Sequence, residues 1–253
     1  MGKHFSNKHF NHKQSNKRRR RSRTFETAEI IEFQSSKFEF ERALPPVKAL
    51  NRKQAAYLDA LHHSPQVIVL GPAGTGKTWI AATYAADLFR NGCIDKIILT
   101  RPNVPCGRSL GYFPGSLENK FVHWAAPVVD AIGERMGKAA YEIALKKGDI
   151  EMVPFEVMRG RSWKNAFVLL DEAQNCTPAE IKTFLTRIGE NCTVVVNGDV
   201  SQCDLDQASG LSTVLHLVKS QMLPVPIVEF AREDIVRSAQ CAMWVHAFEA
   251  ANL

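Results

Sequence analysis

Short apolar runs alternate along this chain with stretches in which apolar residues recur at helical spacing. The first clear run, Gln66–Leu70, is rich in β-branched residues and predicts a buried parallel strand. Behind it, Ile80, Tyr84 and Leu88 recur at a helical interval. The same patterns predict further strands over Lys96–Thr100, Ile150–Phe155, Ala166–Leu170, Cys192–Asn197 and Ile227–Phe230, and helices over Arg52–Leu61, Glu118–Met136 and Lys138–Lys147.

Strands that alternate with helices predict an α/β fold, in which a mostly parallel sheet is covered by helices on both faces. The pattern begins near Lys48, so we expect one α/β domain over residues 48–253. Residues 26–47 alternate loosely and end near two prolines, which predicts an arm packed on this domain. Pro127 is expected to kink or break the helix predicted around it.

The positive charge of the chain is concentrated at its N-terminus. Residues 1–25 contain nine Lys and Arg residues and no Asp or Glu, so the remaining chain is slightly acidic although the whole carries +6. This segment lacks apolar periodicity and predicts a basic disordered tail. Clustered Arg residues attract the phosphates of nucleic acid. A solubilising leader, or an extension without a role, is the alternative interpretation.

Cysteine usage and hydropathy indicate where the protein acts. The six cysteines include no C-x-x-C pair, which argues against a disulfide framework or a zinc site and favours the reducing cytoplasm. No apolar run approaches the roughly 18 residues needed to span a bilayer, and no apolar stretch marks a secretory signal. We therefore expect a cytoplasmic protein without a membrane partner.

The segment that joins the first predicted strand to its helix carries the strongest chemical signal. It reads GPAGTGKT and fits G-x-x-x-x-G-K-[ST], a loop that wraps backbone N–H groups around the phosphates of a nucleotide. A strand before the loop and a helix after it are the context this motif requires. The predicted nucleotide contacts are Gly71, Pro72, Ala73, Gly74, Thr75, Gly76, Lys77 and Thr78.

A second strand ends in two acids that suit phosphoryl chemistry. Asp171 and Glu172 directly follow Ala166–Leu170. Asp171 is expected to hold Mg²⁺ through water beside the Thr78 hydroxyl, and Glu172 to polarise the water that attacks the γ-phosphate. Lys77 is expected to supply positive charge to the phosphoryl oxygens.

Two further turns are predicted near the γ-phosphate. Thr177-Pro178-Ala179-Glu180 is a capping box that starts a helix, which leaves Gln174 and Asn175 on the turn before it, either near the phosphate or as plain turn residues. Gln202 follows the strand predicted over Cys192–Asn197, where ligands of parallel sheets bind, and is placed to sense a third phosphate. Asp199 is expected either to orient Gln202 or to cap the loop.

At this point the motifs become specific to a family. They are GPAGTGKT, LTRP, LGYFPG, MRGRS, LLDEAQN, FLTRIG, NGDVSQCDL, SGL and DIVR. In this order and spacing the chain resembles the PhoH family, the phosphate-starvation-inducible ATPases of bacteria and their phages. The resemblance extends from about Leu50 to Ala250. Cys176 and Cys203 depart from the usual residues without touching a proposed phosphate contact.

This family is also similar to the nucleotide-binding half of superfamily 1 helicases, which implies roles for further residues. Gln54 matches their adenine-reading glutamine, and Gln202 falls on their γ-phosphate-sensing motif. Arg101 matches a position aimed at the nucleic-acid backbone. Arg237 matches an arginine that could reach a γ-phosphate, including that of a neighbouring subunit.

Together these features predict a Mg²⁺-dependent ATPase coupled to RNA or single-stranded nucleic acid. Superfamily 1 helicases close two such domains on one ATP, and only one is recognised here, so a homo-oligomeric ring, expected to be a hexamer, would complete the site. The alternatives are a nucleic-acid-binding protein switched by ATP with little turnover, a small phosphotransferase and a nucleic-acid scaffold that acts through the tail. The four tryptophans, Trp79, Trp124, Trp163 and Trp244, are expected to be core residues rather than stacking platforms.

Overall fold

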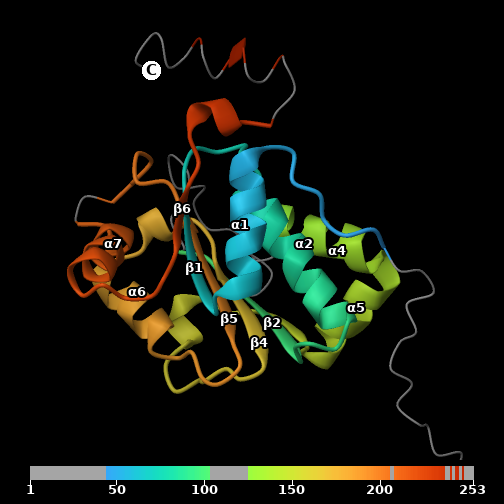
Figure 1. Cartoon of the computed structure of the whole chain (residues 1–253). Helices are drawn as coiled ribbons and strands as arrows, with labels where there is room; N and C mark the ends of the chain where they lie inside the picture. Colours follow the sequence, from blue (N-terminus) through green and yellow to red (C-terminus); the bar gives the residue numbers. More distant parts are fainter. Residues whose placement is uncertain are drawn as a thin grey trace, which may run out of the picture. The chain divides into compact units, whose positions relative to one another are not determined.

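The described part of the protein centres on a six-stranded parallel sheet (Figure 1). The computed structural model describes residues 44–102, 125–205 and 208–236, with Gln240, Met243, Trp244 and Ala247. The strands are β1 (Gln66–Leu70), β2 (Lys96–Thr100), β3 (Ile150–Met152), β4 (Ala166–Leu170), β5 (Thr193–Gly198) and β6 (Ile227–Glu229). Their spatial order is β3-β2-β4-β5-β1-β6. The predicted α/β fold with a parallel sheet is confirmed.

Helices cover both faces of the sheet (Figure 1). The helices are α1 (Arg52–His63), α2 (Lys77–Arg90), α4 (Ala126–Met136), α5 (Lys138–Lys147), α6 (Pro178–Leu185) and α7 (Gly210–Ser220), with 3₁₀ turns η1 (Phe155–Val157), η2 (Ala173–Asn175) and η3 (Arg232–Asp234). Alternate strand residues face opposite sides: Val67 and Val69 pack with α1, α2, α4 and α5, whereas Ile68 and Leu70 pack with α6 and α7. The sheet is therefore buried on both sides, as its continuous apolar strands require.

Several boundaries of the described elements differ from the sequence prediction. The helix predicted over Glu118–Met136 begins at Ala126, with Pro127 in its first turn, where a missing N–H costs no hydrogen bond; the part predicted before residue 125 lies outside the described residues. The strand predicted over Ile150–Phe155 stops at Met152, and Phe155 begins the 3₁₀ turn η1. The tail, most of the arm and the LGYFPG motif lie outside the described residues.

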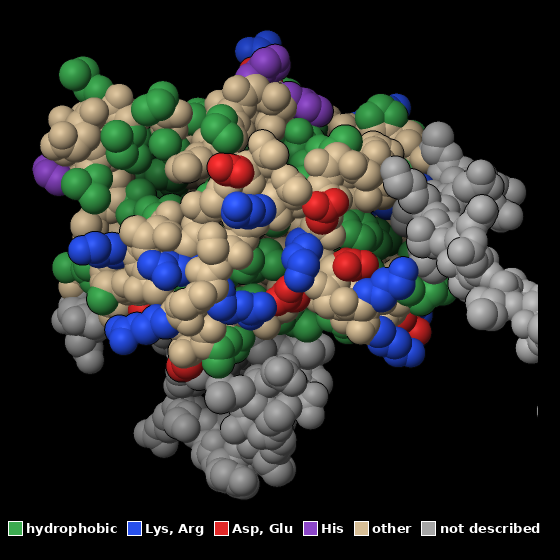
Figure 2. Space-filling view, turned by 90° about the horizontal axis from the view of Figure 1, so that it is seen from below, with side chains coloured by type: hydrophobic (Ala, Val, Ile, Leu, Met, Phe, Trp, Pro, Cys, Tyr) green, Lys and Arg blue, Asp and Glu red, His purple; other side chains and the backbone are tan. Residues whose placement is uncertain are grey.

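Charge on the described surface is mixed. In Figure 2, Lys and Arg side chains are spread over the face seen from below, with Asp and Glu side chains between them. Among the described ion pairs, Glu151 on β3 binds both Lys96 and Arg161. Among the described residues, no helix is long and apolar enough to cross a membrane.

Candidate functional site

The predicted phosphate loop leaves β1 and enters α2 through glycines in left-handed conformations. Gly71 has φ of 133°, and Gly76, at the helix start, has φ of 89°. A Cβ at Gly71 would lie 2.5 Å from the carbonyl oxygen of Phe230, and one at Gly76 would lie 2.9 Å from Nε2 of Gln54. Neither position accepts a side chain without a shift of its surroundings. The loop can therefore present its backbone N–H groups to an anion at the N-terminus of α2.

The side chain of Lys77 forms hydrogen bonds with the phosphate loop. Its Nζ donates to the carbonyl oxygens of Gly71 at 2.5 Å and Pro72 at 2.8 Å. Burial lowers the pKa of the Lys77 ammonium, and the nearby charges of Asp199, Asp171 and Glu172 oppose that shift. The ammonium thus lies at the loop, next to three carboxylates.

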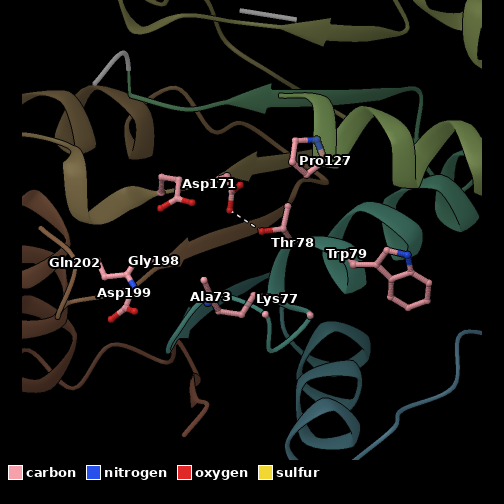
Figure 3. A pocket seen from close by; sticks show the side chains of 12 residues that line it. Ala73, Lys77, Thr78, Trp79, Pro127, Asp171, Gly198, Asp199 and Gln202 are labelled. Atoms are coloured by element: carbon pink, nitrogen blue, oxygen red, sulfur yellow. Dashed lines mark hydrogen bonds between the residues drawn. The ribbon is translucent and has the colours of Figure 1, made fainter. Parts of the chain in front are cut away.

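Thr78 and Asp171 are 93 residues apart in the sequence but are in contact in the structure. The Thr78 hydroxyl donates to Oδ1 of Asp171 at 3.0 Å (Figure 3), and Nδ2 of Asn197 donates to the same oxygen at 3.5 Å. Asp171 is buried, and burial together with the Glu172 charge raises its pKa, while Arg101 and these two hydrogen bonds lower it. A hydroxyl and a carboxylate in contact fit Mg²⁺, which uses few protein ligands and completes its octahedron with phosphates and water.

Glu172 is bound on both sides of its carboxylate. Its backbone adopts a left-handed conformation with φ of 55°, unusual for a residue other than glycine. Oε2 accepts from Nε2 of Gln174 at 2.6 Å, and Oε1 lies 3.7 Å from a guanidinium nitrogen of Arg101. This carboxylate therefore has a fixed direction and a cation beside it.

Gln174 joins the ends of β4 and β5. Its Oε1 accepts from the backbone N–H of Asp199 at 3.0 Å, while its Nε2 binds Glu172. Oδ1 of Asp199 accepts from the N–H and the hydroxyl of Ser201. Of the two roles expected for Asp199, the structure shows the loop cap. Gln174 and Asn175 lie on η2, as predicted, and the capping box of Thr177 and Glu180 is confirmed.

These side chains line one cleft of about 340 Å³ (Figure 3). Its lining comprises Ala73, Gly74, Gly76, Lys77, Thr78, Trp79, Pro127, Asp171, Glu172, Gly198, Asp199 and Gln202. The structure thus brings Lys77 and Thr78 of the predicted loop together with Asp171 and Glu172 at the carboxyl ends of β1, β4 and β5. Gln202, the predicted phosphate sensor, lies in the same cleft.

Two lining residues were not predicted from the sequence. Trp79 is 47% exposed, so the expectation that it is a core residue is wrong, and Pro127 is exposed beside the same cleft. The position of Trp79 directly after Thr78 was the signal available in the sequence. Trp163 is buried as expected, Trp244 is exposed, and Trp124 lies outside the described residues.

Gln54 and Arg237 are not among the residues that line this cleft. Gln54 is buried against the loop, where its Nε2 donates to the Thr75 carbonyl at 3.0 Å and its Oε1 accepts from the Leu50 N–H at 2.8 Å. Its amide retains one donor and one acceptor position, so an adenine contact stays a prediction. Arg237 lies outside the described residues, although the preceding Val236 N–H donates to the Gly74 carbonyl at 2.9 Å.

Comparisons with known proteins agree on one family. Residues 46–249 match the model of the PhoH-like protein family. The chain is 44% identical to Protein PhoH of Escherichia coli K12, over 82% of this chain and 59% of that protein. It is 39% identical to a PhoH-like protein of Bacillus subtilis, over 81% of this chain and 64% of that protein. The chain thus spans less than two thirds of the length of these relatives.

Solved structures resemble it more distantly. The large terminase of a thermophilic bacteriophage has a TM-score of 0.44 and 9% identity, over 79% of this chain and 50% of that one. The Pif1 helicase of Candida albicans has a TM-score of 0.39 and 14% identity, over 74% of this chain and 41% of that one. Likeness at this level says nothing of what this chain binds or does.

Proposed function

This chain belongs to the PhoH family, and we propose that it binds ATP with Mg²⁺ and hydrolyses ATP through attack of water on the γ-phosphate. The observation that carries the proposal is the contact between Thr78 and Asp171 inside the cleft that also holds Lys77 and Glu172. A hydroxyl, a carboxylate, an ammonium and a second carboxylate are the groups that phosphoryl transfer to water requires.

Each residue has a role that follows from its position. Lys77 would exchange its two carbonyl partners for phosphate oxygens, which are stronger acceptors for a cation. Thr78 and Asp171 would hold Mg²⁺, which would neutralise phosphate charge when bound. Glu172 would accept a proton from the attacking water. Gln202, at the other side of the cleft, would contact the γ-phosphate.

Coupling to nucleic acid and assembly into a ring are further parts of this proposal. They are supported by the family resemblance, by the basic residues of positions 1–25 and by Arg101, whose guanidinium is paired with Glu172. RNA or another single-stranded nucleic acid would be the partner. Sizing with a non-hydrolysable ATP analogue tests the ring, for which six subunits are expected; a monomer under these conditions would exclude it.

One observation favours a second candidate function, an ATP-operated switch with little turnover. Both carboxylate oxygens of Glu172 already have partners, and these partners compete with an attacking water for the carboxylate. Steady-state phosphate release, with and without single-stranded RNA, decides between the two. The ATPase requires Mg²⁺-dependent release that disappears in Lys77→Ala. The switch requires that the wild type binds ATP but releases negligible phosphate. A phosphotransferase would instead transfer phosphate only to an acceptor.

A further inference from the structure

The cleft has two chemically different ends. Asp199 and Gln202 lie on one side of Lys77 and Thr78 in Figure 3, whereas Trp79 and Pro127 lie on the other. The first end carries polar and acidic groups. The second end presents an indole and a pyrrolidine ring, and both residues are exposed.

Trp79 contributes little to the core that surrounds α2. Its side chain is 47% exposed, whereas the following residues Ile80, Ala81 and Ala82 are buried and form the face of α2 that packs on the sheet. Ligand clefts are lined largely by apolar and aromatic side chains, and a half-exposed indole in such a cleft offers a planar apolar surface to a ligand. The indole is thus available to a ligand, and its removal should leave the fold intact.

The direction of a bound nucleotide follows from the proposed function, on which this inference rests. Asp171, Glu172 and Gln202 surround the place of the terminal phosphate, and the loop holds the phosphates that precede it. The sugar and base must then extend from the phosphates away from Gln202. This direction leads towards Trp79, the residue directly after Thr78.

We propose that Trp79 is the stacking platform for the nucleobase, with Pro127 of α4 as an apolar wall beside it. Aromatic side chains stack on the π face that every base has, so this contact adds affinity without selecting the base. Any preference for adenine would come from other groups, such as the remaining hydrogen-bonding positions of Gln54. The platform therefore serves nucleotides irrespective of their base.

A ligand without a base separates this role from phosphate binding. We would measure the binding of ATP, GTP and inorganic tripolyphosphate to the full chain with Mg²⁺. Trp79→Ala should weaken the binding of ATP and of GTP by the same factor, about 5- to 100-fold, and leave the binding of tripolyphosphate unchanged. Trp79→Phe should keep most of the affinity. Trp244→Ala, which removes an exposed tryptophan that does not line the cleft, is the matched control and should bind all three normally.

Tryptophan fluorescence gives a second readout. ATP should quench the emission of the wild type, and this quenching should be lost in Trp79→Phe while tripolyphosphate changes neither protein. Unchanged ATP binding by Trp79→Ala, or an equal loss of tripolyphosphate binding, would overturn the platform. So would a variant that binds ATP normally but changes its assembly size, because Trp79 would then be a subunit contact. A wild type that binds neither ATP nor tripolyphosphate would overturn the proposed function itself.

Discussion

The guanidinium of Arg101 lies 3.7 Å from the carboxylate of Glu172, at the ends of two neighbouring strands. Arg101 directly follows β2, and Glu172 is the second residue after β4. Both side chains are about one third exposed, so the pair is open to water and to competing anions. The proposed catalytic base is therefore in contact with a cation that an external phosphate could attract.

Arg101→Ala should raise the basal rate of ATP hydrolysis. The guanidinium competes with the attacking water for Oε1 of Glu172, but solvent weakens such a pair, so we expect at most about a fivefold increase in kcat. Phosphate release at saturating ATP measures it. Lys164→Ala removes an exposed cation paired with Glu190 instead, and should have no effect. A lower kcat in Arg101→Ala would mean that the arginine positions Glu172 for catalysis.

Glu172→Gln should lower kcat by about 10²- to 10⁴-fold while ATP still binds, because an amide cannot accept the proton of the attacking water. The new side chain can still accept from Gln174 through its carbonyl oxygen, so the fold should be preserved. Single-turnover phosphate release, with ATP binding measured in parallel, tests this. Undiminished release would exclude Glu172 as the base.

Thr78→Val should weaken the response of activity to Mg²⁺. Valine has nearly the same shape but lacks the hydroxyl that contacts Asp171. Loss of one hydrogen bond to a charged group corresponds to about a 10- to 100-fold increase in the Mg²⁺ concentration for half-maximal activity. Thr78→Ser retains the hydroxyl and should behave like the wild type. Equal Mg²⁺ titrations for Thr78→Val and the wild type would contradict the metal site.

The buried carboxylate of Asp171 should affect stability in a pH-dependent way. Burial raises its pKa in the folded protein above the ordinary value of 3.8. Between these two pKa values the folded state holds a proton that the unfolded state has released, so this group destabilises the fold as pH rises. Asp171→Asn should therefore gain stability relative to the wild type as pH increases from about 4 to neutrality.

Urea unfolding of both nucleotide-free proteins across this pH range measures the difference. Carboxyl groups that do not interact with Asp171, such as Glu151 with its lowered pKa, contribute equally to both proteins and cancel in the comparison. A constant difference in unfolding free energy at all pH values would contradict the raised pKa of Asp171.

Much of the fold and part of the site could be predicted because their signals are local. Gln66–Leu70, the glycine loop and α2 are consecutive, so strand, turn and helix follow from neighbouring residues. The capping box at Thr177 depends on residues only three positions apart. Boundaries were harder: β3 pairs with β2 only over Ile150–Met152, and the chain then turns at Pro154 into η1.

The sequence by itself determined which chemical groups the protein carries: a phosphate loop, two acids after a strand, and Gln202 after another. Only the tertiary structure decided which of them meet. The order β4-β5-β1 places Asp171 beside Thr78, and Gln174 between Glu172 and Asp199. The tertiary structure likewise decided that Trp79 is exposed and that the Gln54 amide donates to the Thr75 carbonyl. Burial and contact depend on elements distant in sequence, so local patterns alone could not establish them.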